Sequence, residues 1–202
     1  MSIPKTIHMI WIGPDPFPYQ DNLNSYIRQN PTWKVKLWTD ENLPKIKNQV
    51  IYDALKPYAT KADLLRIEIL AIYGGVYADA DSYCRRPLDE LVEGKTCFFT
   101  TNRKSKIEIN LMGCEPGSKI IQNILLKLPL YWKKEVGKRE RHSIYCIYRH
   151  IRKSIRGSEY QTILRIYNCT ADEASNRTFV IQDMATTWND ERYFETVVVK
   201  ND

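Results

Sequence analysis

Hydrophobic and polar positions along this chain follow two periods, one typical of strands and one typical of helices. The almost unbroken apolar run at 6–13 (TIHMIWIG) ends in a glycine and predicts a buried parallel strand. The alternating segment 33–38 (WKVKLW) predicts a second strand, and residues 21–29 between them are weakly helical. We expect Asp40 to cap a helix from residue 41 that ends before Pro57. Strands and helices in alternation predict βαβ units with right-handed crossovers.

Beyond residue 86 the pattern predicts a short helical turn, two strands, two helices and two final strands. We expect these at 88–91, 96–101, 107–114, 118–128, 143–155, 178–182 and 193–199. Ser118 is the expected N-cap of its helix, and Pro129 is the expected end. The chain shows no internal repeat or long linker. The prediction is therefore one α/β domain, 1–202, with a mostly parallel sheet flanked by helices.

The most informative stretch is 62–82 (ADLLRIEILAIYGGVYADADS). Its apolar residues have near-helical spacing, and we expect Thr60 to be the helix N-cap in a capping box with Asp63. Gly74 and Gly75 are expected to end the helix, because glycine adopts left-handed backbone angles at little cost. The residues that follow predict a short strand.

Two aspartates, Asp79 and Asp81, follow this predicted strand. Residues two apart point the same way, and the carboxyl ends of strands are where open α/β sheets bind ligands. Paired carboxylates are hard oxygen ligands typical of a Mg²⁺ or Mn²⁺ site. The alternative is two solvated turn aspartates, because Asp-x-Asp is common by chance. The capped helix, glycine pair and strand before them favour the metal site.

The whole block 62–82 closely resembles the DXD sugar-binding region of the glycosyltransferases typified by yeast initiating mannosyltransferases and the large clostridial glucosylating toxins. The resemblance implies the GT-A fold, a doubly wound sheet that binds a nucleotide-sugar. It implies transfer from a UDP-sugar, such as UDP-glucose, to a hydroxyl of a glycan or glycoprotein, with Mn²⁺ or Mg²⁺ as cofactor. It also implies retention of configuration, although an inverting enzyme would need only one acceptor-side carboxylate and several are available. Chain length and basic character resemble small viral members similar to algal-virus capsid glycosyltransferases.

The same resemblance assigns roles outside the aspartate pair. Asp63 matches an aspartate that holds the ribose hydroxyls or uracil region, and Arg66 matches an arginine that supports nucleotide and sugar. Their spacing alone favours a helix cap with a surface ion pair. Trp11, in a W-I-G segment with Ile12, matches a tryptophan that stacks on uracil; the alternative is a core tryptophan. Asn110 matches a segment near sugar and acceptor, or is simply a polar residue in an edge strand.

Ala80, between the paired aspartates, is included with the nucleotide-binding residues. A late segment is expected to complete the site. In the toxin branch an acidic ligand is followed by a serine three positions later and a tryptophan five positions later. Asp183, Thr186 and Trp188 have that spacing, which predicts a third metal ligand and two donors to the diphosphate. The alternative is an ordinary loop between two strands.

Composition adds limits and one open question. The net charge is +6, and residues 133–156 hold nine Lys or Arg against two Glu. We expect this basic segment to face acceptor or solvent; the alternative function is a nucleic-acid-binding module. An aspartate-nucleophile phosphatase is the other alternative, but Tyr83 stands where that signature requires Thr or Val. Five cysteines without Cys-x-x-Cys spacing, no signal-peptide pattern and no long apolar run predict a cytoplasmic protein of a cell or an infected host cell.

Overall fold

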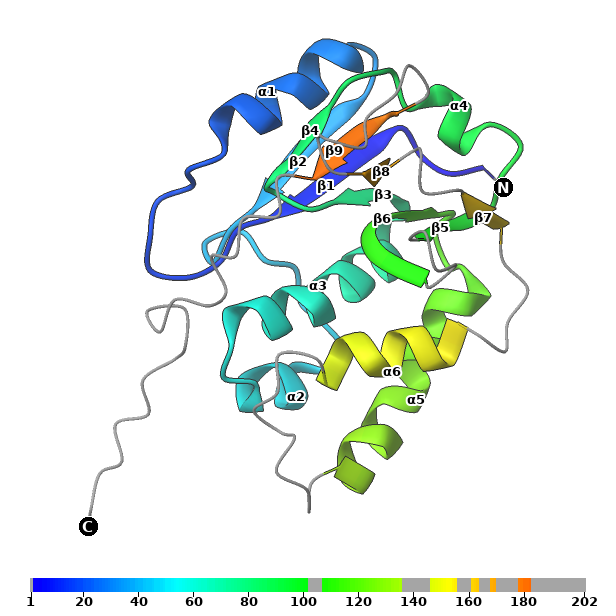
Figure 1. The fold of residues 1–202 in the computed structure, drawn as a ribbon. Helices are drawn as coiled ribbons and strands as arrows, with labels where there is room; N and C mark the ends of the chain where they lie inside the picture. The colour runs from blue at the N-terminus through cyan, green and yellow to red at the C-terminus, as the bar shows by residue number, and fades with distance from the viewer. Residues whose placement is uncertain are drawn as a thin grey trace.

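A mixed sheet forms the centre of the molecule (Figure 1). The computed structural model describes residues 2–101, 107–135, 146–155, 161–163, 168–169 and 178–182. Within these ranges the strand order is β2-β1-β3-β6-β5-β7. The strands are β1 (Thr6–Ile10), β2 (Lys34–Trp38), β3 (Gly75–Ala78), β5 (Cys97–Thr101), β6 (Ile107–Cys114) and β7 (Gln161–Ile163).

Parallel pairing dominates this sheet. β1 pairs in parallel with β2 and β3, and β5 pairs in parallel with β7, whereas β6 runs antiparallel to both of its neighbours, β3 and β5. The predicted α/β class is therefore confirmed, including the strands at 6–13, 33–38, 96–101 and 107–114. Because β1 and β3 are parallel neighbours, the residues that follow them meet at one edge of the sheet.

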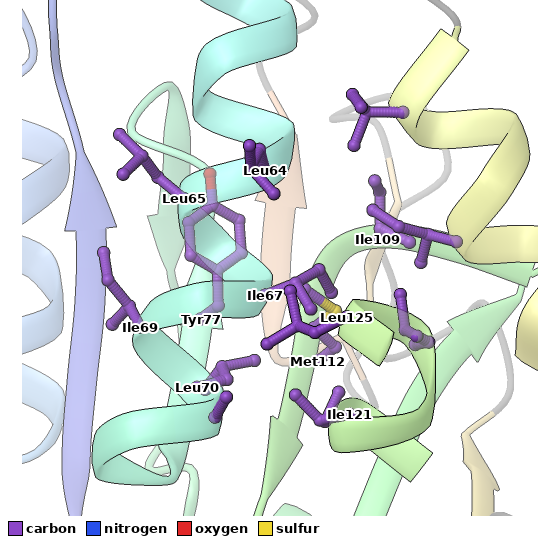
Figure 2. Packing of buried hydrophobic residues seen from close by; sticks show 14 of the residues in the cluster. Leu64, Leu65, Ile67, Ile69, Leu70, Tyr77, Ile109, Met112, Ile121 and Leu125 are labelled. Atoms are coloured by element: carbon purple, nitrogen blue, oxygen red, sulfur yellow. The ribbon is translucent and has the colours of Figure 1, made fainter. Parts of the chain in front are cut away.

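Helices cover one face of the sheet. They are α2 (Gln49–Ala54), α3 (Tyr58–Tyr73), α5 (Lys119–Glu135) and α6 (Cys146–Ile155). Figure 2 shows Ile67 of α3 beside Leu125 of α5 and Met112 of β6, and Leu64 belongs to the same core. Each such side chain, fully buried, contributes about 1.5–3 kcal/mol relative to an exposed one. This core fixes α3 against the sheet.

The other face carries helices and a second, small sheet. α1 (Gln20–Gln29) and α4 (Asp89–Val92) lie on this side, with β4 (Ser82–Cys84), β9 (Val180–Gln182) and β8 (Asn168–Cys169) in the order β4-β9-β8 (Figure 1). Ile7, Met9 and Val76 of the main sheet join this second core. β4 follows the paired aspartates directly, and Ser82 pairs with Gln182 of β9. This pairing brings the end of the described chain to the aspartate pair.

The glycine pair joins α3 to β3 as predicted. Gly74 has φ 62° and Gly75 has φ 93°, conformations that other residues rarely adopt. A Cβ at Gly74 would lie 2.6 Å from the Pro116 nitrogen, and one at Gly75 would lie 2.6 Å from the Thr6 carbonyl oxygen. Both positions therefore need glycine for the turn and for close backbone contact.

Two predicted helix starts are wrong. α3 begins at Tyr58, directly after Pro57, so Thr60 lies inside the first turn and cannot be the N-cap. Proline is common at helix starts because the N–H that it lacks has no helical partner there, and α3 therefore begins earlier than predicted. Asp40 does not cap a helix, because its Oδ2 accepts a hydrogen bond from the Gly13 amide at 2.9 Å and α2 begins only at Gln49.

The predicted end of the helix at Pro129 is also wrong. Pro129 lies inside α5, which continues to Glu135. Leu128 is buried in the core and Trp132 packs against the same core on the far side of the proline. The ring of Tyr131 lies 4.8 Å from that of His150 in α6. These contacts on both sides of Pro129 offset the backbone hydrogen bond that proline removes.

The remaining sequence expectations fall into three groups. Helices at 21–29 and 143–155, the turn at 88–91 and the strand at 178–182 are confirmed within the described ranges, whereas 193–199 lies outside them. Cys84, Cys97 and Cys114 are buried free thiols. Among the residues that the structure describes, no helix combines the length and apolar character that a bilayer crossing requires.

Candidate active site

The candidate site is built around Asp79, the first residue after β3. Its main-chain amide donates to the Asn110 carbonyl at 2.9 Å, which extends the β3–β6 pairing by one residue. Its Oδ1 accepts from Arg66 Nη1 at 3.1 Å and from the Tyr77 hydroxyl at 2.8 Å. Tyr77 lies beneath α3, as Figure 2 shows. One carboxylate oxygen of Asp79 is thus fixed, while Oδ2 faces away from these donors.

Arg66 links α3 to the end of β3. Its Nη2 pairs with Asp63 Oδ1 at 2.8 Å, and its Nη1 pairs with Asp79 and also donates to the Ile109 carbonyl at 2.9 Å. The guanidinium carbon lies 4.5 Å from the centre of the Tyr77 ring. The predicted Asp63–Arg66 pair therefore exists. It is buried, so the expectation of a surface ion pair from spacing alone is wrong.

Burial changes the acid–base properties of these groups. Burial raises the pKa of Asp63 to about 7, against the opposing effect of Arg66. Burial also raises the pKa of Asp79, and Arg66 and the Tyr77 hydroxyl oppose that shift. Burial alone would lower the pKa of Arg66, but the surrounding Tyr77, Asp79 and Asp63 outweigh it and hold that pKa above its ordinary value. The cluster has more buried negative charge than one guanidinium compensates.

Asp79 and Asp81 converge on a single amide group. Gln182 Nε2 donates to Asp81 Oδ1 and lies 3.5 Å from Asp79 Oδ2. The two carboxylates thus meet on one side, as their spacing predicts. The sequence predicts Gln182 only as the last residue of the strand 178–182 and does not predict a role for it in the site. Nothing in the sequence pairs it with the aspartates until β9 is known to lie beside β4.

The donor chemistry of this group fits a divalent cation that prefers oxygen. Asp79 and Asp81 both direct a carboxylate oxygen toward the Gln182 amide nitrogen, so two oxygen ligands converge on one position. The Oε1 of Gln182 is buried, and no described residue forms a hydrogen bond with it. In the described part of the chain, no three His, Cys, Asp or Glu side chains are grouped as metal ligands. Asp183, the predicted third carboxylate, lies outside the described residues, as do Thr186 and Trp188.

Trp11 follows β1 at the same edge of the sheet. Its indole Nε1 donates to the Asp15 carbonyl at 2.8 Å, and its ring meets Phe17 and Tyr19 edge-on at 6.1 and 5.6 Å. Trp11 is half-buried, so the expectation of a core tryptophan does not describe it. Ile12, by contrast, buries its side chain in the helix-side core. Trp11 therefore leaves part of an aromatic surface accessible beside the carboxyl end of β3.

Asn110 lies in an interior strand. β6 has neighbours on both sides, so the alternative of an edge-strand residue is wrong. Its Oδ1 accepts from the Thr100 hydroxyl at 3.4 Å, and its side chain is half-buried. Its main-chain carbonyl is the acceptor that holds the Asp79 amide. Ala80 is buried between the two aspartates.

The described part of the basic segment lies in α5 and α6. Ile147, Ile151 and Ile155 of α6 are buried in the helix-side core, whereas Arg149 and Lys153 are exposed. His150 is buried, and its Nε2 lies 2.8 Å from the Ile124 carbonyl of α5. These contacts account for α6 as a packed amphipathic helix with charges toward solvent, as expected.

Known proteins resemble both the sequence and the structure. Residues 16–98 match the family described as "Glycosyltransferase sugar-binding region containing DXD motif". The "Uncharacterized glycosyltransferase L373" of Acanthamoeba polyphaga mimivirus is 33% identical over 130 residues, 58% of this chain and 50% of the relative. "Inositol phosphoceramide mannosyltransferase 1" of Schizosaccharomyces pombe is 34% identical over 105 residues, 47% of this chain and 33% of the relative.

Two solved structures share the fold. "PaToxG Glycosyltransferase" aligns with a TM-score of 0.61 and 16% identity, covering 77% of this chain and 70% of that one. A glycosyltransferase "involved in the glycosylation of the major capsid of PBCV-1" aligns with a TM-score of 0.51 and 11% identity, covering 93% and 96%. Both alignments support the predicted glycosyltransferase fold.

The chain spans a half or less of the length of the two curated relatives described above. Its matching region nevertheless contains α3, the glycine pair, β3 and both aspartates. The family resemblance predicted from residues 62–82 is therefore confirmed: across residues 16–98 this chain matches the glycosyltransferase sugar-binding region that contains the DXD motif.

Proposed function

We propose that this chain is a glycosyltransferase that moves a sugar from a UDP-sugar to an acceptor hydroxyl on a glycan or glycoprotein. The observation that carries the proposal is the buried chain Asp63–Arg66–Asp79, which ends beside Asp81 where β3 leaves the sheet. The match to the DXD family over residues 16–98 supports the same reaction class. The proposal treats residues 1–202 as one domain, because the described elements pack on two faces of one sheet.

In this proposal the nucleotide lies across the edge shared by β1 and β3. Trp11 offers a partly exposed ring on which uracil stacks, with the main chain at Ile12 alongside. The Asp63 carboxylate accepts hydrogen bonds from ribose hydroxyls, and these bonds stabilise the ionised form that burial disfavours. Arg66 is positioned by Asp63 and Asp79 and directs its guanidinium toward the nucleotide and sugar. The Asn110 amide contributes hydrogen bonds to sugar hydroxyls.

Asp79 and Asp81 would hold a divalent cation, Mn²⁺ or Mg²⁺, with Asp183 as a third ligand. Such a cation supplies charge neutralisation for the departing diphosphate. Thr186 and Trp188 would donate hydrogen bonds to phosphate oxygens. Arg66 keeps Asp79 Oδ1 in place, and Oδ2 lies 3.5 Å from the Gln182 amide nitrogen that also donates to Asp81. The chain's own contribution is therefore orientation of the two carboxylates toward the cation.

A donor screen tests this proposal. Purified protein is mixed with a panel of UDP- and GDP-sugars in Mn²⁺, and thermal unfolding and slow donor hydrolysis are measured. We expect one UDP-sugar to stabilise the fold, by about 2.7 kcal/mol at a hundred times its Kd, and to be hydrolysed. Equal responses to UDP- and GDP-sugars would reject uracil recognition by Trp11. No response to any nucleotide-sugar would reject the proposed function.

A further inference from the structure

Gln182 is the one group in the described site that contacts both carboxylates of the aspartate pair. It is the last residue of β9, 101 positions along the chain from Asp81. Pairing of Gln182 with Ser82 fixes its main chain beside the residue that follows Asp81. Gln182 is buried, with only 8% of the residue exposed. Its amide end is therefore held by the small sheet and cannot retreat freely into solvent.

The two ends of this amide have unequal partners. Nε2 lies between the carboxylates, donating to Asp81 and within 3.5 Å of Asp79 Oδ2. Oε1 is buried and has no hydrogen-bond partner among the residues that the structure describes. A buried acceptor without a partner loses its hydrogen bonds to water and gains none in return, so such a group calls for an explanation. The N–H takes the position between two negative oxygens where a cation would be stabilised most.

From this geometry we propose that Gln182 occupies the cation position in the metal-free chain and becomes a metal ligand when a divalent cation binds. Half a turn about the last side-chain torsion exchanges Nε2 and Oε1. The carboxamide oxygen then faces the ion beside Asp79 and Asp81, and amide oxygens are ordinary ligands of Mg²⁺ and related ions. The partial positive charge of the N–H₂ group holds the carboxylates together until the ion replaces it.

This inference rests on the cation site proposed above and adds a ligand to it. It has two separable consequences. Without metal, Gln182 stabilises the paired carboxylates, so its loss lowers stability in EDTA. With metal, Gln182 contributes an oxygen, so its loss lowers cation affinity. A residue that merely filled space would show neither effect, and one that only competed with the ion would show tighter binding when removed.

The test measures Mn²⁺ alone, by titration calorimetry without any donor sugar. Wild type is expected to bind one ion, and Asp79→Asn to abolish binding. Gln182→Met keeps the side-chain length but has neither donor nor oxygen, and we expect roughly tenfold weaker binding. Gln182→Glu supplies a charged oxygen, and we expect tighter binding than wild type together with a lower melting temperature in EDTA. Gln122→Glu, a change of the same charge on α5, is the matched control and should leave Mn²⁺ affinity unchanged.

The outcomes separate this inference from the proposed function. If wild type binds no Mn²⁺, the proposed cation site fails and the role of Gln182 fails with it. If wild type binds and Asp79→Asn does not, the site stands, and Mn²⁺ affinity of Gln182→Met equal to or above that of wild type overturns the ligand role.

An NMR titration of wild type needs no destabilised variant. Diamagnetic Mg²⁺ should shift the Gln182 side-chain N–H₂ signals, assigned by their absence in Gln182→Glu. Unchanged N–H₂ signals at saturating Mg²⁺ overturn the exchange of the amide ends.

Discussion

Two buried polar clusters adjoin α3, one at its C-terminal end and one at its middle, and they differ in how completely their groups are paired. The His8 cluster comprises His8, Trp38 and the Gly74 carbonyl, where α3 ends. The Arg66 cluster comprises Asp63 and Arg66, in the middle of α3, and Asp79, where β3 leaves the sheet. Both lie on the helix-covered face, and burial shifts pKa values in both.

Every ring nitrogen in the His8 cluster has a partner. The Trp38 indole can only donate, and it donates to His8 Nδ1 at 3.1 Å. His8 Nε2 therefore carries the hydrogen and donates to the Gly74 carbonyl at 3.0 Å. Burial lowers the pKa of His8 to about 4, so the ring is neutral at physiological pH. This cluster is complete and serves the fold.

The Arg66 cluster is incomplete by comparison. Within the described part of the chain, Arg66 Nε is buried without a hydrogen-bond partner, and so is the Oε1 of the adjoining Gln182. Two carboxylates share one guanidinium, with a third carboxylate, Asp81, close by. Complete pairing marks a structural cluster, whereas an unpaired donor, an unpaired acceptor and excess charge at the end of a strand indicate a place for a ligand.

The largest effect on stability is expected from Arg66→Met. The change leaves Asp63 and Asp79 buried without their counter-charge, which should cost about 3–5 kcal/mol. Urea unfolding at pH 8 measures it. The control is Arg28→Met, an exposed arginine on α1, which should cost less than about 1 kcal/mol. Equal costs for the two variants would show that the Arg66 cluster is not a buried ionic unit.

His8→Phe should cost about 3 kcal/mol near pH 7.5, because the Trp38 N–H and the Gly74 carbonyl lose their partner. The cost should shrink with acid. The pKa of His8 in the fold, about 4, is below its ordinary value of 6.5, so its contribution is full above pH 6.5. The unfolding free energy of wild type therefore falls by about 3 kcal/mol as the pH drops from 6.5 toward 4. A difference between wild type and variant that stays constant from pH 7.5 to 4 would contradict a buried neutral His8.

Asp63→Asn should instead stabilise the fold, by up to about 4 kcal/mol at pH 8. The pKa of Asp63 is about 7 in the fold, above its ordinary value of 3.8. Its ionisation therefore costs stability progressively as pH rises from 3.8 to 7. Denaturant unfolding of both proteins at pH 4 and pH 8 should show the gain only at the higher pH. The same variant should bind UDP more weakly, and a variant that is less stable than wild type at pH 8 would contradict this account.

The smallest stability change is expected at Trp11. Trp11→Leu should alter the unfolding free energy by less than about 1 kcal/mol, because the ring is half-buried. Trp38 is the neighbour of Trp11 across the β1–β2 pairing and is only 1% exposed. Trp38→Leu should therefore lower the unfolding free energy several times more than Trp11→Leu. If uracil stacks on Trp11, Trp11→Leu should weaken UDP binding by about 1–3 kcal/mol and reduce fluorescence quenching by UDP. Unchanged UDP affinity in the folded variant would remove Trp11 from the nucleotide site.

Local sequence patterns predicted most of the main sheet. The apolar run at 6–13, the alternation at 33–38 and the Gly74–Gly75 pair each specify their structure within a few residues of chain. The errors arise where a distant partner decided the outcome. Asp40 accepts a hydrogen bond from the Gly13 amide and does not cap a helix. Core contacts beyond Pro129 stabilise α5, so the helix continues past the proline.

The candidate site shows the same division. Asp63, Arg66 and Asp79 are close in the sequence, and helix and strand geometry brings them together as predicted. Burial of the ion pair could not be predicted from spacing, because it depends on Tyr77 and β6 beneath α3. Gln182 could not be predicted either, since its contact with the aspartates depends on strand pairing across a hundred residues.

One measurement tests the central claim most directly: turnover of the UDP-sugar identified by the donor screen, with Mn²⁺, with Mg²⁺ and in EDTA. Wild type, Asp81→Ala and Asp53→Asn are compared, the last being an exposed aspartate on α2 as a control. We expect turnover by wild type and Asp53→Asn only with a divalent cation, and none by a folded Asp81→Ala. Full wild-type turnover in EDTA, or full turnover by Asp81→Ala with Mn²⁺, would contradict a metal-dependent transferase built on Asp79 and Asp81.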